Sequence, residues 1–194
     1  RNYFVSLNKQ QGLSINNQIN CLDLIGEQLK NDELHLWEMS NGCALLNEDG
    51  LLNINAQLSA LNDCKREELK GNLKIGIQWN TEVTLSESKH MVSQAYCSAL
   101  PIAYSNIESI HGEGFARLLL EATYEATLYA ATINLEKTGC NKVYLTLVGG
   151  GVFGNKLKWI LESLSKAINK FKNALLDVSI VSYGHSKQEV RALI

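Results

Sequence analysis

Residues 149–155 read Gly-Gly-Gly-Val-Phe-Gly-Asn and place four glycines in seven positions. Glycine has no Cβ atom, so such a loop can turn its backbone N–H groups outward and let a ligand approach them closely. A strand before the loop and a helix after it would add the positive end of the helix dipole. This combination is typical of phosphate and diphosphate sites, so the loop predicts a nucleotide-type ligand.

Other glycine motifs fit these residues less well. The loop lacks the Gly-Lys-Ser/Thr ending of a Walker A motif, because Asn155 and Lys156 follow Gly154. It is also not a clean Gly-x-Gly-x-x-Gly dinucleotide fingerprint. A glycine-rich tight turn without a ligand is the simpler alternative, but it does not explain why Phe153 stands among the glycines.

Hydrophobic periodicity predicts the elements that position the loop. The short, β-branched, apolar run 142–148 predicts a buried strand, and the spacing of apolar residues predicts a helix over 156–172. A longer helical pattern covers 115–138, and a last strand is expected over 177–183. Strands separated by helices of this length imply parallel neighbours, with a ligand crevice beyond their carboxyl ends.

The patterns upstream are shorter. We expect strand-like residues at 1–7, a helix around 19–29, a turn at 34–39, a strand at 44–46, a turn at 47–50, a helix over 52–69, a strand over 73–79, and paired strands at 82–85 and 91–96. The sequence shows no repeat and no composition shift that would mark a domain boundary. It therefore predicts one α/β domain over residues 1–194.

Composition narrows the function classes. The chain has 194 residues, of which 45% are apolar, and this is enough for one sizeable core. The net charge of −2 argues against broad binding to nucleic acid or anionic membranes, and no apolar run approaches a membrane span. We expect no nucleic-acid or membrane partner.

Cysteine and histidine usage predicts a reducing compartment and no metal. The five cysteines (Cys21, Cys43, Cys64, Cys97 and Cys140) are scattered and odd in number, so we expect mostly buried free thiols in a cytoplasmic protein. None of the four histidines (His35, His90, His111 and His185) has metal-ligand spacing, so no metal or other cofactor is expected.

The segment from Val143 to Asn155 resembles the second phosphate loop of a macrodomain, an ADP-ribose-binding α/β module. Residues 1–5, 36–39, 78–84 and 96–101 resemble blocks of a narrower group, the MavL-type bacterial effector glycohydrolases, which remove ADP-ribose from modified arginine of ubiquitin. The resemblance implies a three-layer α/β/α fold, with a mixed sheet and helices on both faces. It also implies more sequence before Arg1, including the first strands and an adenine-side acidic residue, so an N-terminal fragment of the same protein is an expected partner.

The resemblance also implies a ligand-binding set. Backbone N–H groups of the loop would hold the diphosphate and the distal ribose, Phe153 would pack against that ribose, and Phe4 and Tyr183 would flank the adenine. Asn2 could hydrogen-bond a ribose or a phosphate. The full set is Asn2, Phe4, Gly149, Gly150, Gly151, Val152, Phe153, Gly154, Asn155 and Tyr183. For Phe4 and Tyr183 ordinary core packing is the alternative, and for Asn2 it is a solvated terminus.

The implied catalytic pair is Asn80 and Glu82, and here the chain departs from the pattern. The resemblance leads us to expect Asp where Asn80 stands, and an amide cannot act as a general base. In a strand the two side chains would share a face, where Glu82 could polarise a water or bind an arginine. The implied function is an ADP-ribosyl glycohydrolase acting on ADP-ribosylated protein, ubiquitin included, and in an effector it would act in the host cytosol. A non-catalytic or inactivated ADP-ribose-binding module and a protein-interaction scaffold are the alternatives.

Overall fold

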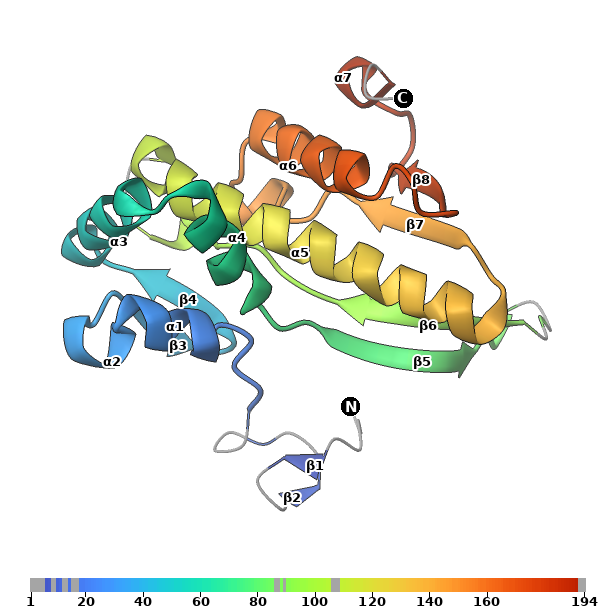
Figure 1. Cartoon of the computed structure of the whole chain (residues 1–194), viewed down its shortest axis with the longest axis horizontal. Coiled ribbons are helices and arrows are strands. Elements are labelled where there is room, and N and C mark those ends of the chain that lie inside the picture. The colour runs from blue at the N-terminus through green and yellow to red at the C-terminus, as the bar shows by residue number, and fades with distance from the viewer. Residues whose placement is uncertain are drawn as a thin grey trace.

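The computed structural model of the chain describes residues 6–7, 10–11, 14, 18–85, 88, 90–105 and 109–191. These residues form a mixed α/β structure with the elements labelled in Figure 1. In chain order they are β1 (Ser6–Leu7), β2 (Gln10–Gln11), α1 (Asp23–Leu29), α2 (Asn31–Leu34), β3 (Trp37–Ser40), β4 (Cys43–Leu46), α3 (Glu48–Ala60), α4 (Asp63–Gly71), β5 (Gly76–Glu82), β6 (Met91–Tyr96), the 3-10 turn η2 (Ile102–Tyr104), α5 (Ser109–Thr138), β7 (Lys142–Thr146), the 3-10 turn η3 (Gly151–Phe153), α6 (Leu157–Lys170), β8 (Asp177–Val181) and α7 (Gln188–Arg191).

The described strands pair two by two. The pairs β1–β2, β3–β4 and β5–β6 are antiparallel, and β7–β8 is parallel, running in register from Lys142 opposite Asp177 to Thr146 opposite Val181. The predicted α/β class and the predicted parallel pair on either side of a helix are therefore confirmed. In Figure 1 the arrows of β6, β7 and β8 point the same way, as expected where a helix connects one strand to the next.

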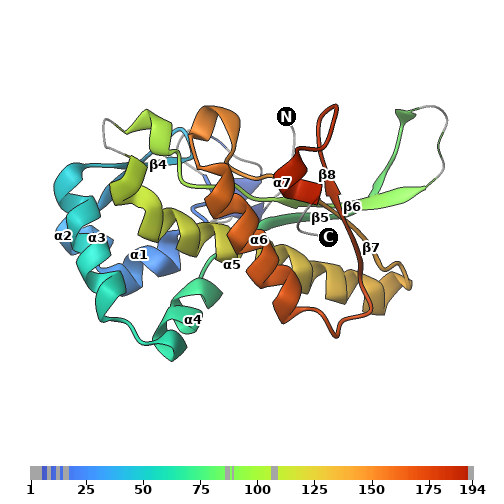
Figure 2. The ribbon, with the colours of Figure 1, turned by 90° about the horizontal axis from the view of Figure 1, so that it is seen from above.

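Helix α5 forms the centre of the core. Leu118, Leu120 and Leu128 are completely buried on it, and α3, α4 and α6 all pack against it, with α4 and α6 close enough for Glu67 and Lys170 to pair. Helix α6 crosses α5 and buries an apolar stripe that includes Trp159 and Leu164 (Figure 2). The predicted 115–138 and 156–172 helices are thus confirmed, and their packing holds α6 and the loop before it in place.

The structure has two helices where the sequence predicted one. The sequence predicted a single helix over 52–69, but α3 ends at Ala60 and α4 begins at Asp63, with Leu61 in extended geometry. The side chain of Asn62 accepts a hydrogen bond from the backbone N–H of Lys65 at 2.9 Å and starts the second helix. Asn47 caps α3 in the same way, so the predicted turn at 47–50 is instead a helix start. Both errors came from counting apolar residues and overlooking asparagine caps.

The strands upstream also differ in extent. The predicted turn at 34–39 contains the end of α2 and the beginning of β3. The predicted strand at 82–85 is wrong beyond its first residue, because β6 pairs with the continuous strand β5 that ends at Glu82. The strand-like prediction at 1–7 falls mostly outside the described residues.

Gly50 provides a sharp test of packing between α3 and the residue before β3. A Cβ atom on Gly50 would lie 2.1 Å from the carbonyl oxygen of Leu36, a backbone atom that cannot swing away. Gly50→Ala is therefore expected to lower the free energy of unfolding by about 3 kcal/mol, measured by urea denaturation. Gly71→Ala is the matched control, because nothing lies within 4 Å of a Cβ there. An equal loss in both variants would contradict the close contact.

Candidate functional site

The glycine loop links the parallel strand β7 to helix α6 and curls back on itself. Gly149, Gly151 and Gly154 all have positive φ, at +80°, +65° and +73°. The N–H of Gly154 donates to the carbonyl of Gly151 at 3.0 Å, and the N–H of Asn155 donates to the carbonyl of Gly149 at 3.1 Å. L-amino acids with side chains rarely adopt these angles, which explains the glycines at these three positions.

Close packing adds a second reason for glycine at two of these positions. A Cβ atom on Gly149 would lie 2.4 Å from the Cβ of Ala99, and one on Gly154 would lie 3.0 Å from the Cβ of Ala103. The segment from Ala99 to Ala103 therefore presses directly against the loop. Sequence reasoning missed this supporting segment, although the resemblance of 96–101 to the glycohydrolase group was a signal for it.

Asn155 ties the loop to that segment. Its side chain is buried, and Nδ2 donates to the carbonyl of Leu100 at 2.8 Å and to that of Gly149 at 3.0 Å. Asn155 was predicted to contribute a backbone N–H to a ligand, but the backbone N–H is used inside the loop and the side chain holds the loop's shape. Asn155 is thus a structural support for the loop.

Asn155→Ala is expected to reduce the free energy of unfolding by about 1–3 kcal/mol, because the buried carbonyl of Leu100 loses its side-chain donor. Chemical denaturation measures this loss. Asn72→Ala is the matched control, since Asn72 donates to Glu68 at an exposed site, and it should cost less than about 0.5 kcal/mol. Equal stabilities for the two variants would show that the Asn155 contacts do not hold the loop.

Backbone donors of the loop are available to a ligand. Within the described part of the chain, the N–H groups of Gly151 and Val152, the first two residues of η3, have no backbone acceptor. Val152 is 75% exposed, and Lys156 at the N-cap of α6 gives the helix no side-chain cap. Unpaired N–H groups at a helix N-terminus favour anions. The arrangement can therefore hold a phosphate or a diphosphate.

Two aromatic residues frame the loop. Phe153 is half-buried, and its ring meets that of Tyr104 edge-on with 5.5 Å between centroids. Tyr124 lies just before the loop, where its hydroxyl donates to the carbonyl of Thr146 at 2.9 Å and accepts from the N–H of Val148 at 3.1 Å. Burial raises the pKa of Tyr124, so this hydroxyl keeps its proton. Its two hydrogen bonds connect the end of β7 to α5. Sequence reasoning missed both tyrosines.

The proposed catalytic pair lies on a different part of the molecule. Asn80 has φ +51° in an irregular stretch of β5, and it and Glu82 are both exposed. Thr81 pairs with Val92, whereas the loop is touched by Ala99, seven residues further along the chain. Val92 is near the start of β6, whereas Ala99 follows the end of that strand at Tyr96, so Asn80 lies toward the tip of the β5–β6 hairpin. The structure does not bring Asn80 and Glu82 to the glycines.

The remaining predicted ligand residues lie apart from the loop or outside the described residues. Tyr183 follows β8 and is fully exposed, so the core-packing alternative is wrong for this residue and its ring is open to solvent. Asn2 and Phe4 lie outside the described residues.

Two cavities flank strand β6. The larger has a volume of about 780 Å³ and lies between the β5–β6 hairpin, α5 and β7, extending from Asn80 to Val148, the residue before the loop. The smaller, about 310 Å³, is lined by residues that include Cys21, Cys43 and Cys97. Burial raises the pKa of Cys21 and Cys97, so these thiols are protonated and poor nucleophiles at neutral pH.

All five cysteines are free, as expected, but the prediction that they are mostly buried is wrong. Cys64 and Cys140 are exposed, and the other three are half-buried. The described residues contain no group of three or more His, Cys, Asp or Glu side chains placed to hold a metal ion. None of the helices in the described ranges is long and apolar enough to cross a membrane.

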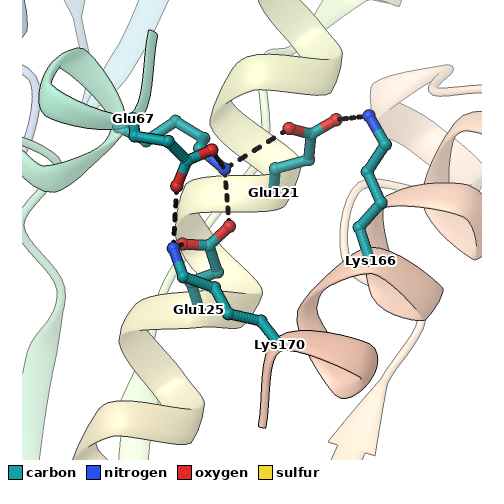
Figure 3. A network of polar contacts seen from close by, with 6 residues as sticks. Glu67, Glu121, Glu125, Lys166 and Lys170 are labelled. Atoms are coloured by element: carbon teal, nitrogen blue, oxygen red, sulfur yellow. Dashed lines mark hydrogen bonds and ion pairs between the residues drawn. The ribbon is translucent and has the colours of Figure 1, made fainter. Parts of the chain in front are cut away.

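A network of ion pairs joins the helices α4, α5 and α6 (Figure 3). Lys70 of α4 contacts Glu67 and Glu125 at 2.6 Å each and Glu121 at 3.6 Å. Lys170 of α6 contacts Glu67 at 2.8 Å and Glu125 at 2.6 Å, and Lys166 contacts Glu121 at 2.7 Å. Every carboxylate therefore has a lysine partner on another element, and the network anchors the C-terminal end of α6, opposite the end that follows the glycine loop.

No family model matches this chain, and neither does any curated protein or solved structure.

Proposed function

We propose that this chain is an ADP-ribose-binding module of macrodomain type, with the diphosphate held by the loop Gly149–Asn155. The observation that carries the proposal is the unpaired backbone N–H groups of Gly151 and Val152, at the start of η3 in the loop that leads into α6. The three-layer fold of the macrodomain belongs to the same proposal. It is supported by the parallel pair β7–β8 with α6 between its strands and α5 before them.

Phe153 and Tyr104 support a ligand larger than phosphate. Their edge-on rings stand beside the loop, and the exposed ring of Tyr104 offers an apolar surface for a ribose. Lys156 follows the loop directly, and its Nζ lies 5.2 Å from the ring centroid of Trp159, so a cation is held near the helix N-terminus. A diphosphate flanked by a sugar fits these neighbours better than an isolated phosphate.

Hydrolysis of ADP-ribosylated protein, with arginine-modified ubiquitin as a substrate, is the second candidate. The observation that favours it is the 780 Å³ cavity, which is lined at one end by Asn80 and at the other by Val148 beside the loop. A substrate that spans this length could meet both ends. The amide of Asn80 provides no general base, so we propose that the chain as it stands binds ADP-ribose without cleaving it.

The experiment has two parts. Isothermal titration calorimetry with ADP-ribose tests binding, and an absence of heat at millimolar ligand would overturn both candidates. Release of ADP-ribose from arginine-modified ubiquitin is then compared between the unchanged chain and the Asn80→Asp variant. Release from the variant alone would identify an inactivated hydrolase, release from neither would leave the binding module, and release from both would overturn the proposal that Asn80 prevents turnover.

A further inference from the structure

The larger cavity is bordered by two strand edges. In the described residues β6 pairs with β5 alone and β7 pairs with β8 alone. Residues from Met91 to Ala95 line the cavity on one side, and residues from Lys142 to Thr146 line it on the other. The arrows of β6 and β7 point the same way in Figure 1, and α5 connects them as a crossover. Two parallel strands with a cavity between their edges have room for a strand to pair with both.

Helix α5 forms the floor of this space. The residues of α5 that line the floor are Tyr124, Thr127, Ala130, Ala131, Asn134 and Thr138, and all of them except Tyr124 have small or short side chains. They recur at three- and four-residue intervals, so they lie along one face of the helix. Every residue of β6 is exposed although the strand lies next to the core helix. A sheet face over a helix is normally covered, so the exposure of β6 indicates a missing layer of contact.

We propose that this space, the slot between β6 and β7, binds an extended, uncharged segment of another polypeptide as an added β-strand. The backbone chemistry supports a strand, because an extended segment supplies N–H and C=O groups toward both edges at once. Charge supports an uncharged segment: among the described residues that line the slot, Lys142 alone is charged, and it is already paired with Asp177. Binding would join β5, β6, β7 and β8 into one sheet over α5.

Side-chain alternation sets the composition of the partner segment. Residues facing α5 would rest on Ala130 and Ala131, which leave room for branched apolar side chains, and the alternate residues would face away from the helix. Each strand bordering the slot is five or six residues long. The matching segment is therefore about six residues, with apolar and polar side chains alternating.

The test uses the whole chain and a capped hexapeptide, acetyl-Thr-Val-Thr-Val-Thr-Val-amide. Cys140 lines the slot and is exposed, so its alkylation by N-ethylmaleimide reports occupancy, while the exposed Cys64 lies outside both cavities and serves as internal reference. With ~1 mM peptide and a Kd of about 0.3 mM, alkylation of Cys140 should slow about fourfold, with no change at Cys64. Hydrogen exchange should slow at residues 91–95 and 142–146 in the same mixture.

The controls separate strand addition from apolar adhesion. A peptide with the same side chains and alternate N-methylated amides cannot pair as a strand, so it should protect neither Cys140 nor the two edges. Ala131→Trp fills the floor and should abolish protection, whereas Ala56→Trp on an exposed part of α3 should not. Protection by the N-methylated peptide, or none by its parent, would overturn the proposal. Protection of the two edges in the absence of peptide would also overturn it. Protection that does not depend on protein concentration would indicate a segment of the same chain in the slot, and protection that rises with concentration would indicate a second copy.

Discussion

Lys70→Met is expected to lower the free energy of unfolding by about 3–5 kcal/mol, which is a large part of the stability of a small domain. The Lys70 side chain is 6% exposed, and its ammonium lies between the carboxylates of Glu67 and Glu125. Methionine fills a similar volume but leaves Glu125, which is 10% exposed, with one cation in place of two. Urea denaturation followed by circular dichroism measures the loss.

Lys74→Met is the matched control for this prediction. Lys74 pairs with Asp23 at 2.7 Å, as close as the buried pairs, but both side chains are more than 40% exposed. The exposed pair should contribute less than about 1 kcal/mol. The double variant Lys70→Met, Glu125→Gln removes the unbalanced charge and should recover part of the loss. A cost for Lys70→Met no larger than that for Lys74→Met would contradict the stabilising role of the network.

The network also predicts how stability depends on pH. Burial opposes ionisation of Glu67, but hydrogen bonds from Lys170 and Lys70 outweigh it and lower the pKa of Glu67. Burial likewise opposes the charge of Lys70, and hydrogen bonds to Glu125 and Glu67 outweigh it and raise the pKa of Lys70. The stability that Glu67 contributes is fully present above its ordinary pKa of 4.5 and is lost as the pH falls below it. The stability that Lys70 contributes is fully present below its ordinary pKa of 10.5 and is lost as the pH rises above it.

Gly149→Ala is expected to weaken ADP-ribose binding at least about thirtyfold, equivalent to about 2 kcal/mol. The added methyl would lie 2.4 Å from the Cβ of Ala99 and 2.9 Å from Nδ2 of Asn155, at a φ of +80°. The loop cannot keep its path with this clash, so the unpaired N–H groups of Gly151 and Val152 would be displaced. Calorimetry with ADP-ribose on the folded variant measures the effect.

Two further variants make this result specific. Gly139 has a similar positive φ, +74°, but nothing lies within 4 Å of a Cβ there, so Gly139→Ala should cost some stability and leave the affinity unchanged. Val152→Glu changes a 75% exposed side chain of the loop, so it should fold normally and repel a diphosphate. Unchanged affinity in both Gly149→Ala and Val152→Glu would place the ligand away from the loop.

The local elements of this chain were predictable because their signals are local. Apolar spacing predicted α5 and α6, and the β-branched run before the glycines predicted β7. The asparagine caps at Asn47 and Asn62 were visible in the sequence as well, and reading them would have corrected the two helix boundaries.

The sequence by itself determined that a glycine loop joins a strand to a helix, because backbone freedom and hydrophobic period are properties of neighbouring residues. Tertiary structure alone decided what supports that loop: Ala99 and Leu100 reach it from a segment about fifty residues away in the chain, and nothing in their composition predicts this contact. The same holds for the distance between Asn80 and the glycines, which depends on how far β5 and β6 extend. It also holds for the slot between β6 and β7, since strand pairing is a long-range choice that residue types constrain only weakly.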